Sequence, residues 1–188
     1  TCHLAMSPDA QAAAVLHFWF DETPPALHFA RDAGLDAAIA ERFGALHAEL
    51  SRRVTPDWRA TPQQRLAAVI VLDQFSRNLF RGSAAAFAQD AKAQALAELA
   101  IERGDEAVLT AKQRQFLYLP FMHGEDKVSQ ARSVALFEAL GEADALLFAQ
   151  AHRDVIARFK RFPSRNEALG RTTTPAEAAW LASPEARF

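Results

Sequence analysis

The apolar residues of this chain recur at spacings of three and four, which is the period of an α-helix. The stretch from Leu35 to Arg53 shows the pattern plainly, with apolar residues at positions 35, 39, 43, 46 and 50 on one stripe. No window alternates as a half-buried β-strand does, and no hairpin dipeptide occurs. Alanine, which favours helix, is abundant. The pattern predicts an all-α protein.

Capping residues and helix breakers divide this pattern into about eight helices. Thr61, Thr110 and Thr174 are each followed three residues later by glutamine or glutamate, the signature of a capping box. We expect helices over residues 8–20, 35–53, 61–82, 83–103, 110–119, 125–140, 142–159 and 174–181. The turns between them are short, so neighbouring helices should be antiparallel. We therefore predict stacked helical hairpins in a single domain spanning residues 1–188.

Ionisable residues interrupt the most apolar helix. Apolar residues surround 66–72 on every side, so this segment should be buried all round. Its stripe at helical spacing continues from Ile70 to Asp73 and Arg77, which therefore lie where core residues should lie. Because they are four residues apart, we expect the two side chains to pair, since an unpaired buried charge is costly. The neighbouring Gln74, Asn78 and Arg81 extend this polar cluster.

Two further segments carry candidate chemistry. Residues 152–171 mix arginines with apolar anchors, which favours a loop packed against the body rather than a solvated charge run. His123 and Glu125 suit acid–base partners or two ligands of a metal, while Glu125 is also explained as a first-turn helix residue that the helix dipole favours. Because a His-x-Glu pair alone is a weak metal signal, we expect no metal. For the arginine clusters, an anion site and a purely structural network both remain open.

Composition narrows the classes of function. At 188 residues and a net charge of −2, the chain does not have the basic character of a nucleic-acid-binding protein. It has no run of about 18 apolar residues, so we expect no membrane partner. Cys2 is the only cysteine, which favours a reducing compartment, and we expect a cytoplasmic protein without a cofactor. Phosphate-binding loops, nucleophile elbows and dinucleotide fingerprints do not occur in the sequence.

Long stretches of the sequence resemble a bacterial family known as domain of unknown function 924. The resemblance is carried by LDQFSRNLFRGSAAAFAQDAKA, by FLYLPFMHGEDKVSQARSVALF and by HRDVIARFKRFPSRNEALGRTTTPAE. It implies an all-helical, tetratricopeptide-like fold with a right-handed superhelix, and it implies no reaction. The family's recurrent polar positions fall on Asp73, Gln74, Arg77, Asn78, Arg81, His123, Glu125, Gln130, His152, Arg161, Arg165, Asn166 and Arg171. The sequence departs from the family at Gly124, Lys160 and Ser164, where serine, glycine and histidine are usual.

These observations lead to three hypotheses about function. We expect Asp73, Arg77 and Arg81 to meet His123, Glu125 and the loop 161–171 around a single polar pocket. In the first hypothesis, this pocket holds a small anionic ligand or a peptide carboxylate. Its ligand-binding residues would be Asp73, Gln74, Arg77, Asn78, Arg81, Arg161, Arg165, Asn166 and Arg171. In the second, the chain is a metal-independent hydrolase or transferase on a phosphorylated or carboxylated substrate, with His123, Glu125 or His152 as catalytic candidates. In the third, the polar core is structural and the chain is a scaffold for protein partners.

Overall fold

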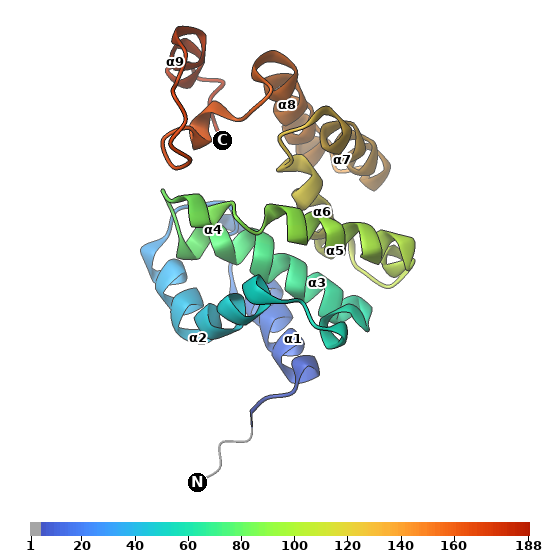
Figure 1. Cartoon of the computed structure of the whole chain (residues 1–188). Coiled ribbons are helices and arrows are strands. Elements are labelled where there is room, and N and C mark those ends of the chain that lie inside the picture. Colours follow the sequence, from blue (N-terminus) through green and yellow to red (C-terminus); the bar gives the residue numbers. More distant parts are fainter. Residues whose placement is uncertain (1–4) are drawn as a thin grey trace.

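The computed structural model describes residues 5–188, and these residues form helices and turns without a β-strand (Figure 1). The α-helices are α1 Pro8–Leu16, α2 Ala33–Arg52, α3 Pro62–Ile70, α4 Ser76–Leu79, α5 Asp90–Glu102, α6 Ala111–Met122, α7 Lys127–Leu140, α8 Ala143–Phe159 and α9 Pro175–Leu181. The prediction of an all-α protein is confirmed. Cys2, which we expected to be unpaired, lies outside the described residues.

The central helix is one continuous rod with a change of winding in its middle. A π-helical turn at Val71–Phe75 joins α3 to α4, so the described part of the chain contains eight helical rods, as predicted. A second π-helical turn, His17–Glu22, continues α1. Rings from the two turns meet, because Trp19 and Phe18 both pack edge-on against Phe75. π-Helical turns of this kind occur often at functional sites.

Several predicted helix boundaries are wrong. The central rod ends at Leu79 rather than at Gly82, because Phe80 leaves helical geometry, and Gly82 takes a positive φ in the turn that follows. The next helix starts at Asp90 rather than Ser83, after a short 3₁₀ turn over residues 84–86. Helix α6 does not stop before Pro120 but runs through it to Met122, with Pro120 buried in the last turn.

Caps explain most of the helix starts. Thr110 and Thr174 form complete capping boxes with Gln113 and Glu177, as predicted. Thr61 accepts a hydrogen bond from the backbone N–H of Gln64, but the reciprocal half of that box is missing. The Gln64 side-chain oxygen is instead buried without a partner in the described part of the chain.

The main hydrophobic core is built around α3. Residues 66–72 are fully buried, because α1, α5, α6 and α2 with its neighbouring turns pack around this rod. Helices α6, α7 and α8 then pack in series. A smaller core of Val155, Ile156, Phe162 and Trp180 joins α8 to the C-terminal loop and α9, which lie at the top of Figure 1. The packing of successive neighbours is consistent with helical hairpins, and the right-handed, tetratricopeptide-like superhelix stays a prediction.

None of the helices in residues 5–188 combines the length and hydropathy that crossing a bilayer requires.

Candidate functional site

Asp73 lies on the π-helical turn and is almost completely buried. One of its carboxylate oxygens is 2.7 Å from Nδ1 of His123, and the other accepts a hydrogen bond of 2.8 Å from the Gln74 amide. Burial acts to raise the pKa of Asp73, but the charges of His123 and Arg77 and these hydrogen bonds outweigh it and lower the pKa to about 2. Asp73 is therefore a buried carboxylate whose principal partner is His123.

The expected pairing of Asp73 with Arg77 is present only as a secondary contact of 3.6 Å. Arg77 instead donates two hydrogen bonds, of 2.8 and 3.0 Å, to the carboxylate of Asp90 at the start of α5. Its Nη1 also bonds the backbone oxygen of Asp73 at 2.9 Å. A bidentate fork fits a planar carboxylate better than one side-on contact within a single helix does, which explains the choice of partner.

Two histidines near Asp73 have fixed tautomers. Nδ1 of His123 donates to the Asp73 carboxylate, and Nδ1 of His152 donates to the Phe148 backbone oxygen at 2.7 Å, since these oxygens only accept. Neither Nε2 has a hydrogen-bond partner among the described residues, and neither is enclosed. Burial lowers the pKa of His152 to about 3, with His123, Arg165 and Arg77 adding to the effect. At neutral pH, Nε2 of His152 therefore only accepts hydrogen bonds.

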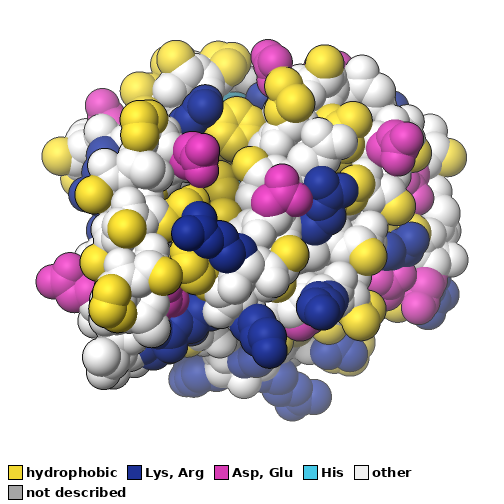
Figure 2. All heavy atoms as spheres, turned by 90° about the horizontal axis from the view of Figure 1, so that it is seen from above, with side chains coloured by type: hydrophobic (Ala, Val, Ile, Leu, Met, Phe, Trp, Pro, Cys, Tyr) yellow, Lys and Arg dark blue, Asp and Glu magenta, His cyan; other side chains and the backbone are white. Residues whose placement is uncertain are grey.

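Both histidines line a cavity of about 500 Å³ between α4, α6, α8 and the C-terminal residues, which we call the His123 cavity. Its polar lining consists of His28, Gln74, Arg77, Asn78, Arg81, Gln115, His123, Asp144, His152 and Arg187. Its apolar lining consists of Phe29, Ala30, Leu119, Met122, Ala145, Phe148 and Phe188. Figure 2 shows the face that carries α8 and α9, where hydrophobic side chains gather in a hollow with charged side chains around it. The volume falls within the range of cavities that hold small molecules in proteins.

The arginines of this cavity are only partly used by the protein. Arg81 binds the Asp36 carboxylate through Nε and Nη2, and Asn78 donates to the same carboxylate. Nη1 of Arg81 has no acceptor in residues 5–188. Arg187 and Asp144 form no ion pair within the described residues. The cavity thus offers guanidinium donors, the Nε2 atoms of two imidazoles and one free carboxylate.

Arg165 lies behind His123 rather than in the cavity. Its guanidinium is held between the rings of Phe87 and Phe162, at 4.5 and 4.7 Å from the ring centroids. It donates to the backbone oxygen of His123 at 3.0 Å, while its contacts with Asp90 and Glu125 are long, 3.5 and 3.6 Å. Burial and the nearby Arg77 lower its pKa to about 10. Arg165 and Glu125 line a second cavity, of about 520 Å³, on the other side of His123.

The remaining predicted site residues hold the loop between α8 and α9. Arg171 donates to the Glu125 carboxylate and to the Phe162 backbone oxygen, and its Nε bonds the side chain of Asn166. Arg161 forms a bidentate pair with Glu177, both bonds being 2.8 Å. The arginines and amides of the loop satisfy its own turns, so Arg161, Asn166 and Arg171 do not join Arg81 in the His123 cavity, contrary to the predicted single pocket.

Glu125 also has a structural role in this geometry. It accepts the backbone N–H of Phe162 at 2.8 Å as well as the Arg171 guanidinium, and it makes no contact with His123 as an acid–base partner. Gln130, the other recurrent polar residue of this region, donates to the backbone oxygens of Met122 and Gly124 and closes the end of α6.

A buried histidine–serine pair, His47 and Ser76, lies on α2 and α4. Nε2 of His47 is 2.7 Å from Oγ of Ser76, which resembles a nucleophile and its base. The Ser76 hydroxyl donates to the Leu72 backbone oxygen at 2.6 Å, so the imidazole must donate to the serine rather than accept from it. Ser76 is fully buried, and burial lowers the pKa of His47. This pair is structural.

Sequence reasoning missed the residues that complete the site from distant helices. Asp90 and Asp36 neutralise Arg77 and Arg81, and Phe148 and Phe188 form apolar walls. The acids were visible only as first-turn residues of two helices, a position that the helix dipole explains without a site. The sequence carries no signal for the apolar walls, because the exposure of Phe29 and Phe148 is visible only in the structure.

Within the described residues, no three His, Cys, Asp or Glu side chains are arranged to hold a metal ion.

Comparison with known proteins now identifies the family. The profile described as "Bacterial protein of unknown function (DUF924)" matches residues 15–185. The chain belongs to the DUF924 family. Its fold is similar to a solved structure described as "Structure of Protein of Unknown Function ATU0120 from Agrobacterium tumefaciens", with 39% identity and a TM-score of 0.88 over 94% of this chain and 99% of that chain. No curated protein matches the sequence.

The departures from the usual DUF924 pattern lie outside the His123 cavity. Lys160 takes the left-handed conformation at the end of α8, with φ of 62°. A Cβ on Gly124 would lie 2.4 Å from Cβ of Ser129, so this chain has no room for serine there. Ser164 is exposed and lines none of the cavities described above. None of the three alters the Asp73–His123 pair.

Proposed function

We propose that the His123 cavity binds a small organic acid that carries a hydroxyl or amide N–H group beside its carboxylate. The observation that supports it most is the set of unpaired polar atoms that share this cavity. Nη1 of Arg81 and the guanidinium of Arg187 are donors suited to a carboxylate, whereas Nε2 of His152 only accepts and so requires a donor on the ligand. Phe29, Leu119 and Met122 would contact the ligand's apolar atoms.

This proposal narrows the hypothesis of a tetratricopeptide-like, arginine-rich binding module. The charges of Arg77 and Arg165 are largely neutralised by Asp73, Asp90 and Glu125, so these two arginines should contribute little to the binding of an anion. Arg81 and Arg187 supply the free donors instead. A peptide carboxylate would meet the same groups. The hydrogen bonds of Arg161, Asn166 and Arg171 within the chain support a structural role for these three residues rather than ligand binding.

The test is titration with two probes of equal length, 3-hydroxybutyrate and butyrate, followed by isothermal calorimetry and thermal shift. We expect 3-hydroxybutyrate to bind more tightly, and Arg81→Ala to weaken its binding about tenfold or more, the effect of losing one charge-assisted hydrogen bond. The matched control is Arg132→Ala, which removes an exposed ion pair with Glu98 on α5. Arg81→Lys keeps the charge and serves if the alanine variant is unstable.

Absence of binding by both acids would refute the proposal. Equal affinity of 3-hydroxybutyrate for wild type, Arg81→Ala and Arg132→Ala would also refute it, because the site would then lie elsewhere.

A second candidate function is catalysis, favoured by the Asp73–His123 pair. The buried Asp73 carboxylate accepts the Nδ1–H of His123, so Nε2 of His123 faces the cavity as a general base. The negative charge of Asp73 also stabilises the imidazolium that forms when Nε2 takes up a proton. His152, with its pKa lowered to about 3, is not an acid at neutral pH. A metal-independent hydrolase would use His123 to activate water.

The test of catalysis is the hydrolysis of methyl 3-hydroxybutyrate. We expect turnover by the wild type, loss of turnover in His123→Gln and wild-type turnover in the control His17→Gln. An inactive wild type would contradict catalysis on esters of this class.

A further inference from the structure

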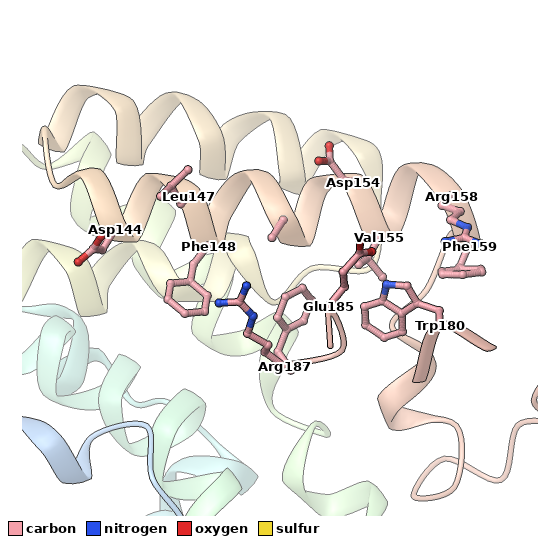
Figure 3. A pocket seen from close by; sticks show the side chains of 12 residues that line it. Asp144, Leu147, Phe148, Asp154, Val155, Arg158, Phe159, Trp180, Glu185 and Arg187 are labelled. Carbon is pink, nitrogen blue, oxygen red and sulfur yellow. The ribbon is translucent and has the colours of Figure 1, made fainter. Parts of the chain in front are cut away.

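A second hollow lies directly beside the His123 cavity. It is a groove of about 690 Å³ along α8, which we call the α8 groove, and its walls include Leu147, Val155, Phe159 and Trp180 (Figure 3). The Leu147 side chain is 63% exposed, which is unusual for a large apolar residue. The lining is predominantly apolar, and its charged members are Asp144, Asp154, Arg158, Glu185 and Arg187.

The groove and the cavity share a wall. Asp144, Phe148, Arg187 and Phe188 line both of them. In Figure 3 the side chains of Arg187 and Phe148 point toward one another across the near end of the groove. One thin layer of side chains therefore separates two spaces that together exceed the volume a four-carbon acid needs.

The layer is held by aromatic contacts and by few hydrogen bonds. The Phe188 ring stacks on His152, with centroids 3.7 Å apart, and meets Trp180 and Phe162 edge-on at 6.0 and 6.3 Å. The backbone of residues 186–188 donates only two hydrogen bonds, both to nearby turns, at 3.3 and 2.9 Å. Arg187 has no ion pair in the described part of the chain. A ligand chain that replaces the Phe188 contacts would cost the protein little, because no buried polar group loses its partner.

We infer that the ligand of the His123 cavity is an acid with an extended hydrocarbon chain, and that this chain lies in the α8 groove. The inference rests on the proposed function, since the acid end remains beside Arg81 and His152. The occupant follows from adjacency: an apolar groove that one displaceable layer of side chains separates from a polar cavity suits an amphiphile whose two ends differ in the same way. The exposed side chains of Leu147 and Phe148 then become its outer wall.

The experiment is a chain-length series, 3-hydroxybutyrate, 3-hydroxyoctanoate and 3-hydroxydecanoate, titrated against the full chain. We expect the ten-carbon acid to bind about 30-fold more tightly than the four-carbon acid. Ala151 lines the groove but not the cavity, so Ala151→Phe should remove this gain and leave 3-hydroxybutyrate unchanged. The matched control is Ala157→Phe on the exposed face of α8, which should keep the gain.

The outcomes separate the inference from the proposed function. If 3-hydroxybutyrate binds and longer acids bind no better, the groove is not used and the inference is overturned. A gain that survives in Ala151→Phe, and in Leu147→Asp as a second variant at the exposed lip, also overturns it. If none of the acids binds, the proposed function itself fails.

Discussion

Arg77 shows what a single buried charge does in this protein. It is the common partner of Asp90 and, more weakly, of Asp73, both of which are largely buried. Arg77→Ala removes the closest cation from Asp90 and the second partner of Asp73, and leaves Asp90 only the long contact with Arg165, so we expect the free energy of unfolding to fall by about 3 kcal/mol. Urea denaturation measures this change directly.

The comparison variant is Arg81→Ala, because Arg81 also forms a bidentate carboxylate pair but lies closer to solvent. We expect it to cost less than about 1 kcal/mol, as a partly exposed ion pair does. An equal decrease in the free energy of unfolding in both variants would contradict the larger contribution that we assign to the pair of Arg77 and Asp90.

His152 should make the stability of the protein depend on pH. Its pKa is about 3 in the native state because of burial, against the ordinary value of 6.5 in the unfolded chain. Between these values the unfolded state binds a proton that the native state does not, so stability falls as the pH decreases from about 6.5 toward 3. We expect His152→Asn, whose amide can still donate to the Phe148 oxygen, to reduce the slope of unfolding free energy against pH. His17→Asn, at an exposed position, should keep the wild-type slope; an unchanged slope in His152→Asn would contradict the assignment.

The end of α8 carries strain that one substitution should relieve. Lys160 follows the last residue of α8 with φ of 62°, and it is the sole non-glycine residue with positive φ in residues 5–188. A side chain in this region costs about 1 kcal/mol or more relative to glycine. We expect Lys160→Gly to raise the free energy of unfolding by about 0.5–1 kcal/mol, less than the full strain because glycine is also freer in the unfolded chain. Lys160→Ala removes the same charge without relieving the strain, so a gain in that variant as well would point to electrostatics instead.

Helices were predictable here because their signals are local. Alanine content, period and the caps at Thr110 and Thr174 lie within one turn of what they determine. The burial of Asp73 was predictable too, from its place on an apolar stripe. Its position beside His123 was predicted as well, as part of a single polar pocket. The direct pairing expected with Arg77 is weaker than predicted, because a π-helical turn changes the direction of side chains after Ile70, and nothing in the local pattern of apolar residues indicates that turn. Asp73 therefore meets His123, fifty residues away, while Arg77 turns to Asp90.

At the scale of the whole molecule, residues 160–188, which we call the C-terminal segment, are joined to the rest of the protein by a few charged contacts and by the smaller core around Trp180. Glu125 accepts the Phe162 N–H and the Arg171 guanidinium, and Arg165 reaches the His123 backbone. The same segment supplies Arg187 and Phe188 to the wall of the His123 cavity. The loop residues Arg161, Asn166 and Arg171 therefore support the segment that carries these two wall residues, without lining the cavity themselves.

This arrangement predicts that the C-terminal segment opens as a unit. Glu125→Ala removes the acceptor that holds both Phe162 and Arg171, so we expect amide hydrogen exchange over residues 160–188 to accelerate about tenfold or more, because local opening needs less free energy once these bonds are absent. Helix α3 lies in the main core and should keep its wild-type protection. Arg132→Ala, which breaks an exposed pair between α7 and α5, should change neither region. Equal acceleration in α3 would mean that the segment unfolds only with the whole protein, and the cavity wall formed by Phe188 would then be as rigid as the core behind it.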